Sequence, residues 1–311
     1  MIEALSHLLS IKTELLWAAL VSTAVSAAVS YYFRRREARH KLAVEYEYEQ
    51  RKKLRDLIGC YHGRLLQVCN SLNYRLWNLY TNANAAWLDS GGDYQKPGYY
   101  MLSFVHRFLA VFSFIRQFEN EAIYVDGRIA EKKDFIFLNY LDAIRWVMTD
   151  VALFEGITYD GSHQRDHFFA DNFRQYCDGC SVEGNFITYE KLKDHVATLR
   201  SLDPVFAYFD SLRPSEDRLR WDRLIALHLL LMAFINSFGY RPQYSSQTNF
   251  DSVAGQVRRQ RILDNLVDWL PRHGLGKDKE SKRIIHACQA LRKSRAKSDG
   301  LAKLGPRPGA D

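Results

Sequence analysis

The stretch "LLWAALVSTAVSAAVSYYFRRREARHK", from Leu15 to Lys41, decides how this chain is organised. Its first part, residues 15–33, carries no formal charge. As a helix it would be about 28 Å long, close to the ~30 Å hydrocarbon layer of a bilayer. Trp17 lies near one end and Tyr31 and Tyr32 lie at the other, where amphipathic rings settle at membrane interfaces. The stretch therefore predicts a transmembrane helix over residues 15–33.

Basic side chains that directly follow a membrane span mark its cytoplasmic side. The leader, residues 1–14, has Lys12 as its basic residue, whereas a basic cluster follows the span at Arg34, Arg35, Arg36, Arg39 and Lys41. We therefore expect a single-pass protein of the inner (plasma) membrane. Its short leader would be extracytoplasmic, the bulk of the chain would be cytoplasmic, and the lipid bilayer would be its first partner.

Three other interpretations of residues 15–33 compete with a membrane span. A cleaved signal peptide would have basic residues before its apolar core and no arginine cluster directly after it. An interfacial amphipathic helix would show a charged face, which this run lacks. A buried helix of a soluble domain is the third alternative, because serine and alanine dilute the hydrophobicity. The transmembrane helix agrees best with the pattern.

Small residues recur in the predicted span at every fourth position, at Ala18, Ser22, Ser26 and Ser30. This spacing places them on one helical face and lets transmembrane helices approach each other closely. We interpret the face as a surface for homo-oligomerisation or for packing against a partner membrane helix. The competing interpretation is chance, because the whole span is rich in alanine and serine.

The composition excludes some classes of protein. With 311 residues, of which 47% are hydrophobic and 14% aromatic, the chain can build a packed core. Its five scattered cysteines are not the dense framework of a small secreted disulfide domain, so we expect reduced thiols. The net charge is +7, but basic residues concentrate in 34–55 and 277–303, which leaves a mildly acidic body. This distribution favours lipid or protein partners over nucleic acid.

Beyond the arginines the sequence predicts helices. A stripe of apolar residues at steps of three and four predicts a long basic helical stalk over residues 34–88. A loop, "DSGGDYQKPG" at 89–98, separates this stalk from an all-α domain at 99–296, and residues 297–311 have the composition of a disordered tail. The predicted fold class is all-α: a single transmembrane helix, a stalk and a cytosolic multi-helix bundle. The stripe consists of Leu54, Ile58, Tyr61, Leu65, Val68, Leu72, Leu76 and Leu79.

Local signals predict further boundaries in the bundle. Ser215 is a predicted helix cap and Gly239 the end of that helix, a turn is predicted at residues 126–127, and helices are expected at about 250–270 and 278–296. Two apolar runs do not indicate further spans, because His106 and Arg107 interrupt one and the other, before Gly239, is too short. The basic C-terminal helix has an apolar side, which suits a membrane surface or a partner groove.

The strongest chemical motif is "SHQRDHFFADNFRQYCDGC". His163, His167 and Asp171 are spaced by four residues and would share one face of a helix, and Cys177 and Cys180 form a CxxC pair. Imidazole nitrogens and thiolates suit zinc, and four such ligands would close a tetrahedral site. A lone CxxC is a weak signal, and surface histidines beside core thiols explain the same residues without a metal.

Ionisable residues in otherwise apolar helices are further candidates for lining a ligand pocket. Snorkelling or a local hydrogen bond explains such residues equally well. Glu119, Glu121, Asp142 and Asp150 are available as partners. The candidates are His62, Arg64, His106, Arg107, Arg145 and His228.

No phosphate-binding loop, nucleotide-binding fingerprint, nucleophile elbow or zinc-protease motif occurs in the sequence. We therefore expect an interaction protein rather than an enzyme. It would be a sensor, scaffold or membrane-linked effector, by architectural analogy in stress or phage defence, with a protein partner at the cytosolic bundle. One alternative is a metal-dependent helical enzyme that uses His163, His167 and Asp171. Another is a membrane-tethered nucleic-acid binder.

Overall fold

The computed structural model describes residues 2–123, 129–182 and 185–303, and it describes residues 2–15, 182 and 299–303 by their backbone alone. The chain divides into two compact units, Met1–Leu54 and Arg55–Asp311. Helix α1, Ile2–Thr81, contributes residues to both units. It contains no proline, and its first glycine is Gly59, so the sequence favours an uninterrupted helix.

The N-terminal unit, Met1–Leu54, consists of the first part of α1. The described side chains of residues 16–49 are all exposed in it. The helix is regular here: Thr23 Oγ1 donates a hydrogen bond to Ala19 O at 2.7 Å, and Glu47 and Arg51 pair at 3.6 Å with i,i+4 spacing. It continues without a break through residues 33 and 34, where the predicted span ends and the predicted stalk begins.

The C-terminal unit, Arg55–Asp311, is helical, which confirms the all-α prediction for the described residues. One hairpin of two-residue strands, β1 (Ser181–Val182) and β2 (Asn185–Phe186), pairs Ser181 with Phe186. The helices that follow α1 are α2 (Tyr99–Ala122), α3 (Lys132–Val147), α4 (Ala170–Gly179), α5 (Tyr189–His195), α6 (Asp203–Phe209), α7 (Arg220–Phe238), α8 (Gln247–Gly255), α9 (Gln260–Arg272) and α10 (Lys279–Lys303), with 3₁₀ turns η2 (Val151–Phe154), η3 (Arg200–Leu202) and η4 (Arg241–Gln243).

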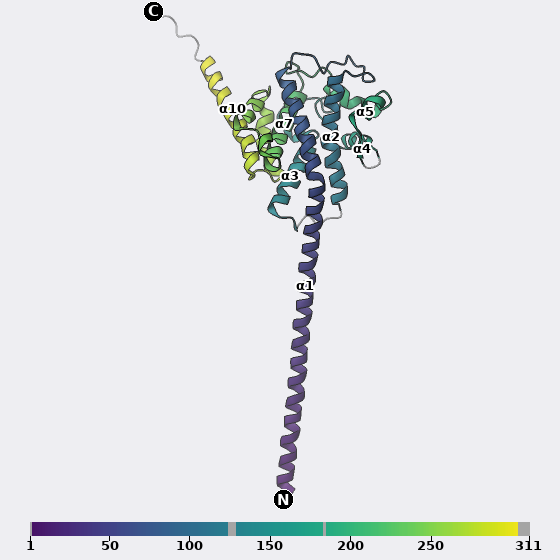
Figure 1. Cartoon of the computed structure of the whole chain (residues 1–311). Coiled ribbons are helices and arrows are strands. Elements are labelled where there is room, and N and C mark those ends of the chain that lie inside the picture. Colours follow the sequence, from purple (N-terminus) through teal and green to yellow (C-terminus); the bar gives the residue numbers. More distant parts are fainter. Residues whose placement is uncertain (1, 124–128, 183–184, 304–311) are drawn as a thin grey trace, which may run out of the picture. The chain divides into compact units, whose positions relative to one another are not determined.

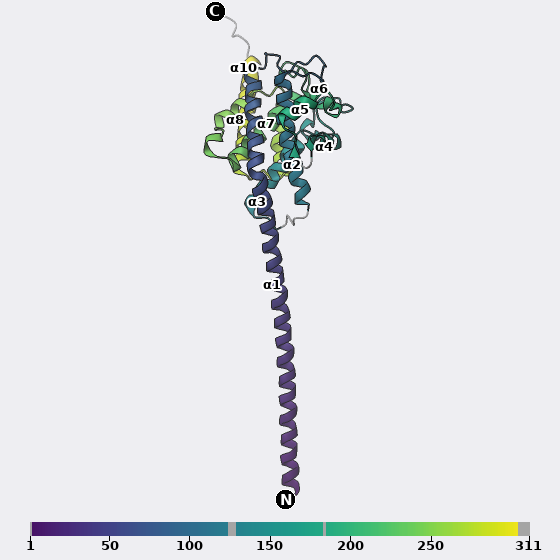
Figure 2. The same ribbon diagram turned by 45° about the vertical axis from the view of Figure 1, so that its right-hand side comes forward.

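Helix α7 lies in the core of the C-terminal unit. It packs against α3, α8, α9 and α10, and its residues from Arg220 to Asn236 are buried. Figures 1 and 2 show it behind the last turns of α1. Helix α7 is long and apolar enough to cross a membrane, but 89% of its apolar window is buried inside the protein. It is a core helix because it is buried, and not because its apolar run is too short to cross a membrane, as the sequence suggested.

The part of α1 in the C-terminal unit packs through the predicted apolar stripe. Tyr61, Leu65, Leu72, Leu76 and Leu79 are buried, as heptad-like spacing requires of one helical face. Hydrogen bonds tie this part of α1 to α2 and α7: Tyr61 OH donates to Glu121 Oε1 at 2.6 Å, and Tyr80 OH donates to Leu224 O at 3.3 Å.

Two predicted boundaries in the bundle are wrong, because distant carboxylates set the actual ones. Ser215 does not cap α7, because this helix begins at Arg220. The preceding amide, that of Leu219, donates a hydrogen bond to Asp166 Oδ1 at 2.7 Å. The single helix expected at 250–270 is two helices, α8 and α9. The segment between them is held by buried Asp222, whose carboxylate accepts hydrogen bonds from the amides of Arg258 and Arg259 at 2.7 and 3.1 Å. Gly239 ends α7 as predicted.

The apolar side of the basic C-terminal helix is not available to a membrane or partner groove in this structure. Ile284 and Cys288 of α10 are buried, and the helix packs against α7, α8 and α9. Figure 2 shows α8 beside α7 and α10. Helix α10 extends to Lys303, beyond the expected start of a disordered tail at residue 297. The rest of that tail, 304–311, and the turn predicted at 126–127 lie outside the described residues.

Candidate functional site

The first functional feature is the exposed apolar segment of the N-terminal unit. Trp17 is 69% exposed, Val25 56% and Tyr31 67%. The helix is long and apolar enough to cross a membrane, a property that signal sequences near an N-terminus share, and none of its apolar window is buried within the protein. Water is an unfavourable medium for so many apolar side chains, at about 25 cal/mol per Å² of apolar surface. This segment therefore needs a cover that the folded chain does not supply.

The predicted helix-packing face and the predicted basic cluster both lie on this exposed helix. The described side chains at these positions are all exposed. No side-chain hydrogen bond or ion pair of either set occurs within the described part of the chain. The face comprises Ala18, Ser22, Ser26 and Ser30, and the cluster comprises Arg34, Arg35, Arg36, Arg39 and Lys41.

The residues predicted to bind zinc do not share a helix face. Helix α4 begins at Ala170, so His163 and His167 lie in the preceding loop and the helical expectation is wrong. His163 is exposed, with Nδ1 3.3 Å from Asp160 Oδ2. His167 is buried, and its ring lies edge-on to Tyr159. Asp171 is exposed and accepts a hydrogen bond from Arg174 at 2.9 Å.

The CxxC pair lies in the core. Cys177 and Cys180 are buried, and burial raises the pKa of both thiols, that of Cys180 to about 12. Protonated thiols are poor metal ligands and poor nucleophiles. Among residues 2–123, 129–182 and 185–303, no group of three or more histidine, cysteine, aspartate and glutamate side chains is arranged to hold a metal ion. The described structure thus gives no geometric support to the predicted zinc site.

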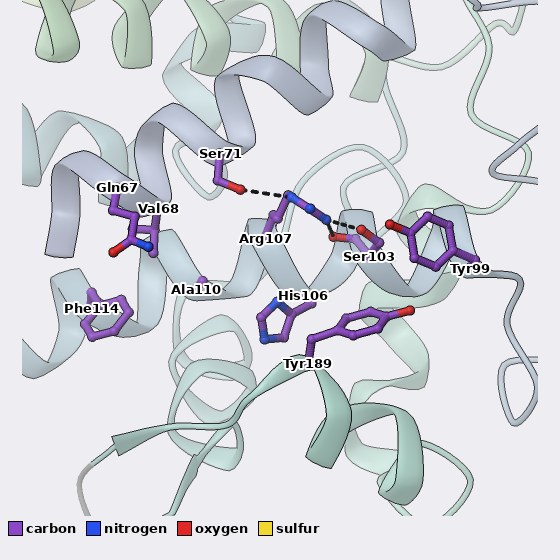
Figure 3. A pocket seen from close by; sticks show the side chains of 10 residues that line it. All are labelled: Gln67, Val68, Ser71, Tyr99, Ser103, His106, Arg107, Ala110, Phe114 and Tyr189. Atoms are coloured by element: carbon purple, nitrogen blue, oxygen red, sulfur yellow. Dashed lines mark hydrogen bonds between the residues drawn. The ribbon is translucent and has the colours of Figure 1, made fainter. Parts of the chain in front are cut away.

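A cleft of about 460 Å³ lies between α1, α2 and the start of α5. Figure 3 shows its two ends. Gln67, Val68 and Phe114 lie at one end, and Ser103 and Tyr99 lie at the other. The remaining lining residues are Ser71, His106, Arg107, Ala110 and Tyr189.

Arg107 dominates the polar part of this cleft. Its Nε donates to Ser71 Oγ at 2.9 Å, and its Nη1 donates to Ser103 O at 3.0 Å and to Ser103 Oγ. Burial lowers the pKa of Arg107, and so does the positive charge of Arg75. In the described part of the chain, no carboxylate oxygen lies within 4 Å of the guanidinium of Arg107 or Arg75. The charged form of Arg107 is therefore held by neutral groups.

A second hollow of about 400 Å³ adjoins the cleft and shares Ser71 and Arg107 with it. Its other lining residues are Tyr74, Arg75 and Asn78, all on α1. Arg75 Nη2 donates to Ser103 Oγ at 2.8 Å, and its guanidinium carbon lies 4.5 Å from the centre of the Tyr100 ring. Two guanidinium groups thus converge on one hydroxyl, Ser103 Oγ, at the junction of the two hollows.

Aromatic side chains form the rest of the wall. Tyr99 and Tyr189 lie with ring centres 6.1 Å apart, and the His106 ring lies 5.8 Å from that of Tyr189. Hydrogen bonding to Arg75 lowers the pKa of the Tyr99 hydroxyl. Burial lowers the pKa of His106, whose Nε2 lies 3.0 Å from Ile187 O, so the imidazole is neutral near pH 7.

Sequence reasoning found part of this cleft. His106 and Arg107 were visible as ionisable residues in an otherwise apolar helix, whereas Arg75 and Ser71 look like ordinary polar-face residues of α1. Two of the other candidates, Arg145 and His228, have partners inside the bundle. Arg145 pairs with Glu119 at 2.9 Å and Asp142 at 2.6 Å, as expected. His228 lies with Nε2 2.7 Å from Asn73 Oδ1.

Comparisons with known proteins identify no relative of this chain. The chain matches no protein-family model, no curated protein and no solved structure.

Proposed function

We propose that this chain is a single-pass membrane-anchored interaction protein of the inner (plasma) membrane. Residues 15–33 cross the bilayer with the N-terminus outside. The C-terminal helical unit acts in the cytoplasm as a sensor, scaffold or membrane-linked effector that engages a protein partner.

The observation that supports this proposal is the contrast between the two apolar helices. The window in α7 is 89% buried and needs no other cover, whereas the window near the N-terminus is 0% buried. A bilayer would cover the second window at little cost, because burying each valine or leucine side chain is favourable by about 1.5–3 kcal/mol. The arginine cluster after Phe33 supports the cytoplasmic placement of the remainder.

The exposed face of small residues supports an oligomer, or a complex with a partner membrane helix, as the working form. Such faces drive association because backbones that approach closely gain dispersion contacts that lipid tails do not supply. A membrane helix that self-associates would bring the C-terminal units of two copies together. This is the arrangement that a sensor or scaffold uses to report on a ligand.

Two matched substitutions on α1 test the anchor. Val25→Arg places a charge in the middle of the predicted span, where it costs about 2.5–3.5 kcal/mol on an insertion scale. Val44→Arg makes the same change on an exposed position of the same helix beyond the span. After alkaline extraction of membranes, Val25→Arg should leave the membrane pellet and Val44→Arg should stay in it. Equal retention of both variants would overturn the proposal.

A further inference from the structure

We propose that the cleft at Arg75 and Arg107 binds a small nucleotide-class ligand, with its phosphate at the two guanidinium groups and its aromatic base toward Phe114. This inference deepens the proposed function, since it names the ligand to which a membrane-anchored sensor would respond.

Two cations, Arg75 and Arg107, meet in this cleft without a carboxylate partner among the described residues. Arg75 and Arg107 both donate to Ser103 Oγ, so their positive charges lie close together. Burial lowers the pKa of Arg107, and the positive charge of Arg75 lowers it further. Like charges in a partly desolvated site repel each other, and a doubly charged anion between them would remove this repulsion. Paired guanidinium groups are the donors that bind phosphate oxygens bidentately.

Other arginines of the bundle are held differently: several contact carboxylates, and the fully buried Arg223 donates to the backbone carbonyls of Val147 and Asp150. Arg145 pairs with Glu119 and Asp142, and Arg220 pairs with Glu216. Arg116 lies 3.5 Å from Asp178. Arg75 and Arg107 instead line the two adjoining hollows, where they donate hydrogen bonds to hydroxyl and carbonyl groups and the Arg75 guanidinium also lies over the Tyr100 ring. Hydroxyls such as those of Ser71 and Ser103 can also donate to a phosphate.

The opposite end of the cleft suits a flat ring. Val68, Ala110 and Phe114 present apolar surface there, and Gln67 carries an amide that can both donate to and accept from a base edge. Figure 3 shows Gln67 and Phe114 at the end away from Tyr99. The volume of about 460 Å³, extended by the adjoining 400 Å³, is in the range of about 300–1,000 Å³ for small-molecule sites.

The test is calorimetric titration of the full-length protein in detergent. The ligands are adenine and guanine mono- and triphosphates, with inorganic phosphate and adenosine as the two halves of the ligand. The proposal expects at least one nucleotide to bind about tenfold or more tightly than either half. Equal affinity for inorganic phosphate, or no binding of any nucleotide, would overturn it. Competition by vesicles of anionic phospholipid, or tighter binding of single-stranded RNA, would overturn it as well, because either would assign the arginines to a different anion.

Three variants test the residues. Arg107→Gln should weaken nucleotide binding by about 10- to 100-fold, because it removes charge-assisted hydrogen bonds. Arg116→Gln, which removes a guanidinium outside the cleft, should change affinity less than twofold. Equal losses in these two variants would contradict the assignment.

The third variant distinguishes a loss of ligand binding from a loss of folding. Ser71→Asp places a carboxylate beside Arg107 Nε, so it should pair with the guanidinium and compete with the ligand. We expect an unchanged or higher melting temperature together with a tenfold or greater loss of nucleotide affinity. Full affinity in this variant would overturn the proposal. Because the titrations are made in detergent, their failure would leave the result of the membrane-extraction test unaffected.

Discussion

Replacing Arg223 by methionine tests whether α7 is a core helix of the C-terminal unit. Arg223 is 0% exposed. Its Nη1 donates to Val147 O at 2.7 Å and its Nη2 donates to Asp150 O at 3.1 Å, at the C-terminal end of α3. The guanidinium carbon also lies 4.0 Å from the centre of the Phe154 ring. Methionine has a similar length but removes both donors and the charge that complements the end of α3.

The expected loss of stability follows from these contacts. Each buried carbonyl left without a donor costs about 1–3 kcal/mol, so the two together cost about 2–6 kcal/mol. Burial lowers the pKa of Arg223 to about 10, which means that its charge already carries a desolvation cost that methionine would relieve. We therefore expect a net loss of about 2–4 kcal/mol in the free energy of unfolding. In a domain of this size that lowers the melting temperature by about 5–10 °C.

The assay is thermal unfolding of the full-length chain in detergent, followed by circular dichroism. Arg272→Met is the matched control, since Arg272 is exposed on α9 and its replacement should change stability by less than about 0.5 kcal/mol. A helix that crossed a bilayer would instead gain from losing this charge. A melting temperature of Arg223→Met at or above that of the wild type would therefore refute the core assignment of α7.

Three further predictions concern α1 and the core. Gly63→Ala should raise the free energy of unfolding by about 1 kcal/mol in urea titrations, because nothing lies within 4 Å of an added Cβ; a loss would reveal an unseen close contact. Burial lowers the pKa of His228 to about 3. Between about pH 6.5 and 3 this histidine therefore binds a proton in the unfolded chain but not in the folded protein, so the free energy of unfolding falls as the pH drops below about 6.5. Between about pH 6.5 and 5 the wild type should lose about 2 kcal/mol more than His228→Gln, and parallel losses would contradict this assignment. In a transmembrane reporter assay on residues 12–36, Ser26→Leu should abolish the association signal, and an unchanged signal would refute the packing face.

The elements that sequence predicted well are those set by local periodicity. The stripe from Tyr61 to Leu79 faces the core because side chains at steps of three and four must lie on one face of a helix. The loop predicted at 89–98 lies within the longer connection 82–98, because α1 ends at Thr81 and not at residue 88 as predicted for the stalk. Gly239 ends α7 as predicted. The interruption of an apolar run by His106 and Arg107 correctly indicated a buried helix rather than a second span.

The elements that sequence missed are set by contacts between distant residues. Asp166 caps the start of α7 across 53 positions, and Asp222 separates α8 from α9 across 36. Neither pairing leaves a trace in local spacing. The same is true of the cleft, since the spacing of residues on α1 gives no sign that Arg75 meets Ser103. The helix face predicted for His163, His167 and Asp171 is wrong for the opposite reason: their regular spacing suggested one helix, but α4 begins only at Ala170 and the two histidines lie in the preceding loop.

The most direct test of the membrane anchor is the accessibility of the two chain ends in sealed, right-side-out membrane vesicles. Epitope tags on the N-terminus and the C-terminus would be exposed to external protease with and without detergent. With residues 15–33 as a single span, protease should remove the N-terminal tag from intact vesicles and reach the C-terminal tag only after detergent is added. Protection of both tags in intact vesicles, or recovery of the chain in the soluble fraction, would contradict the account.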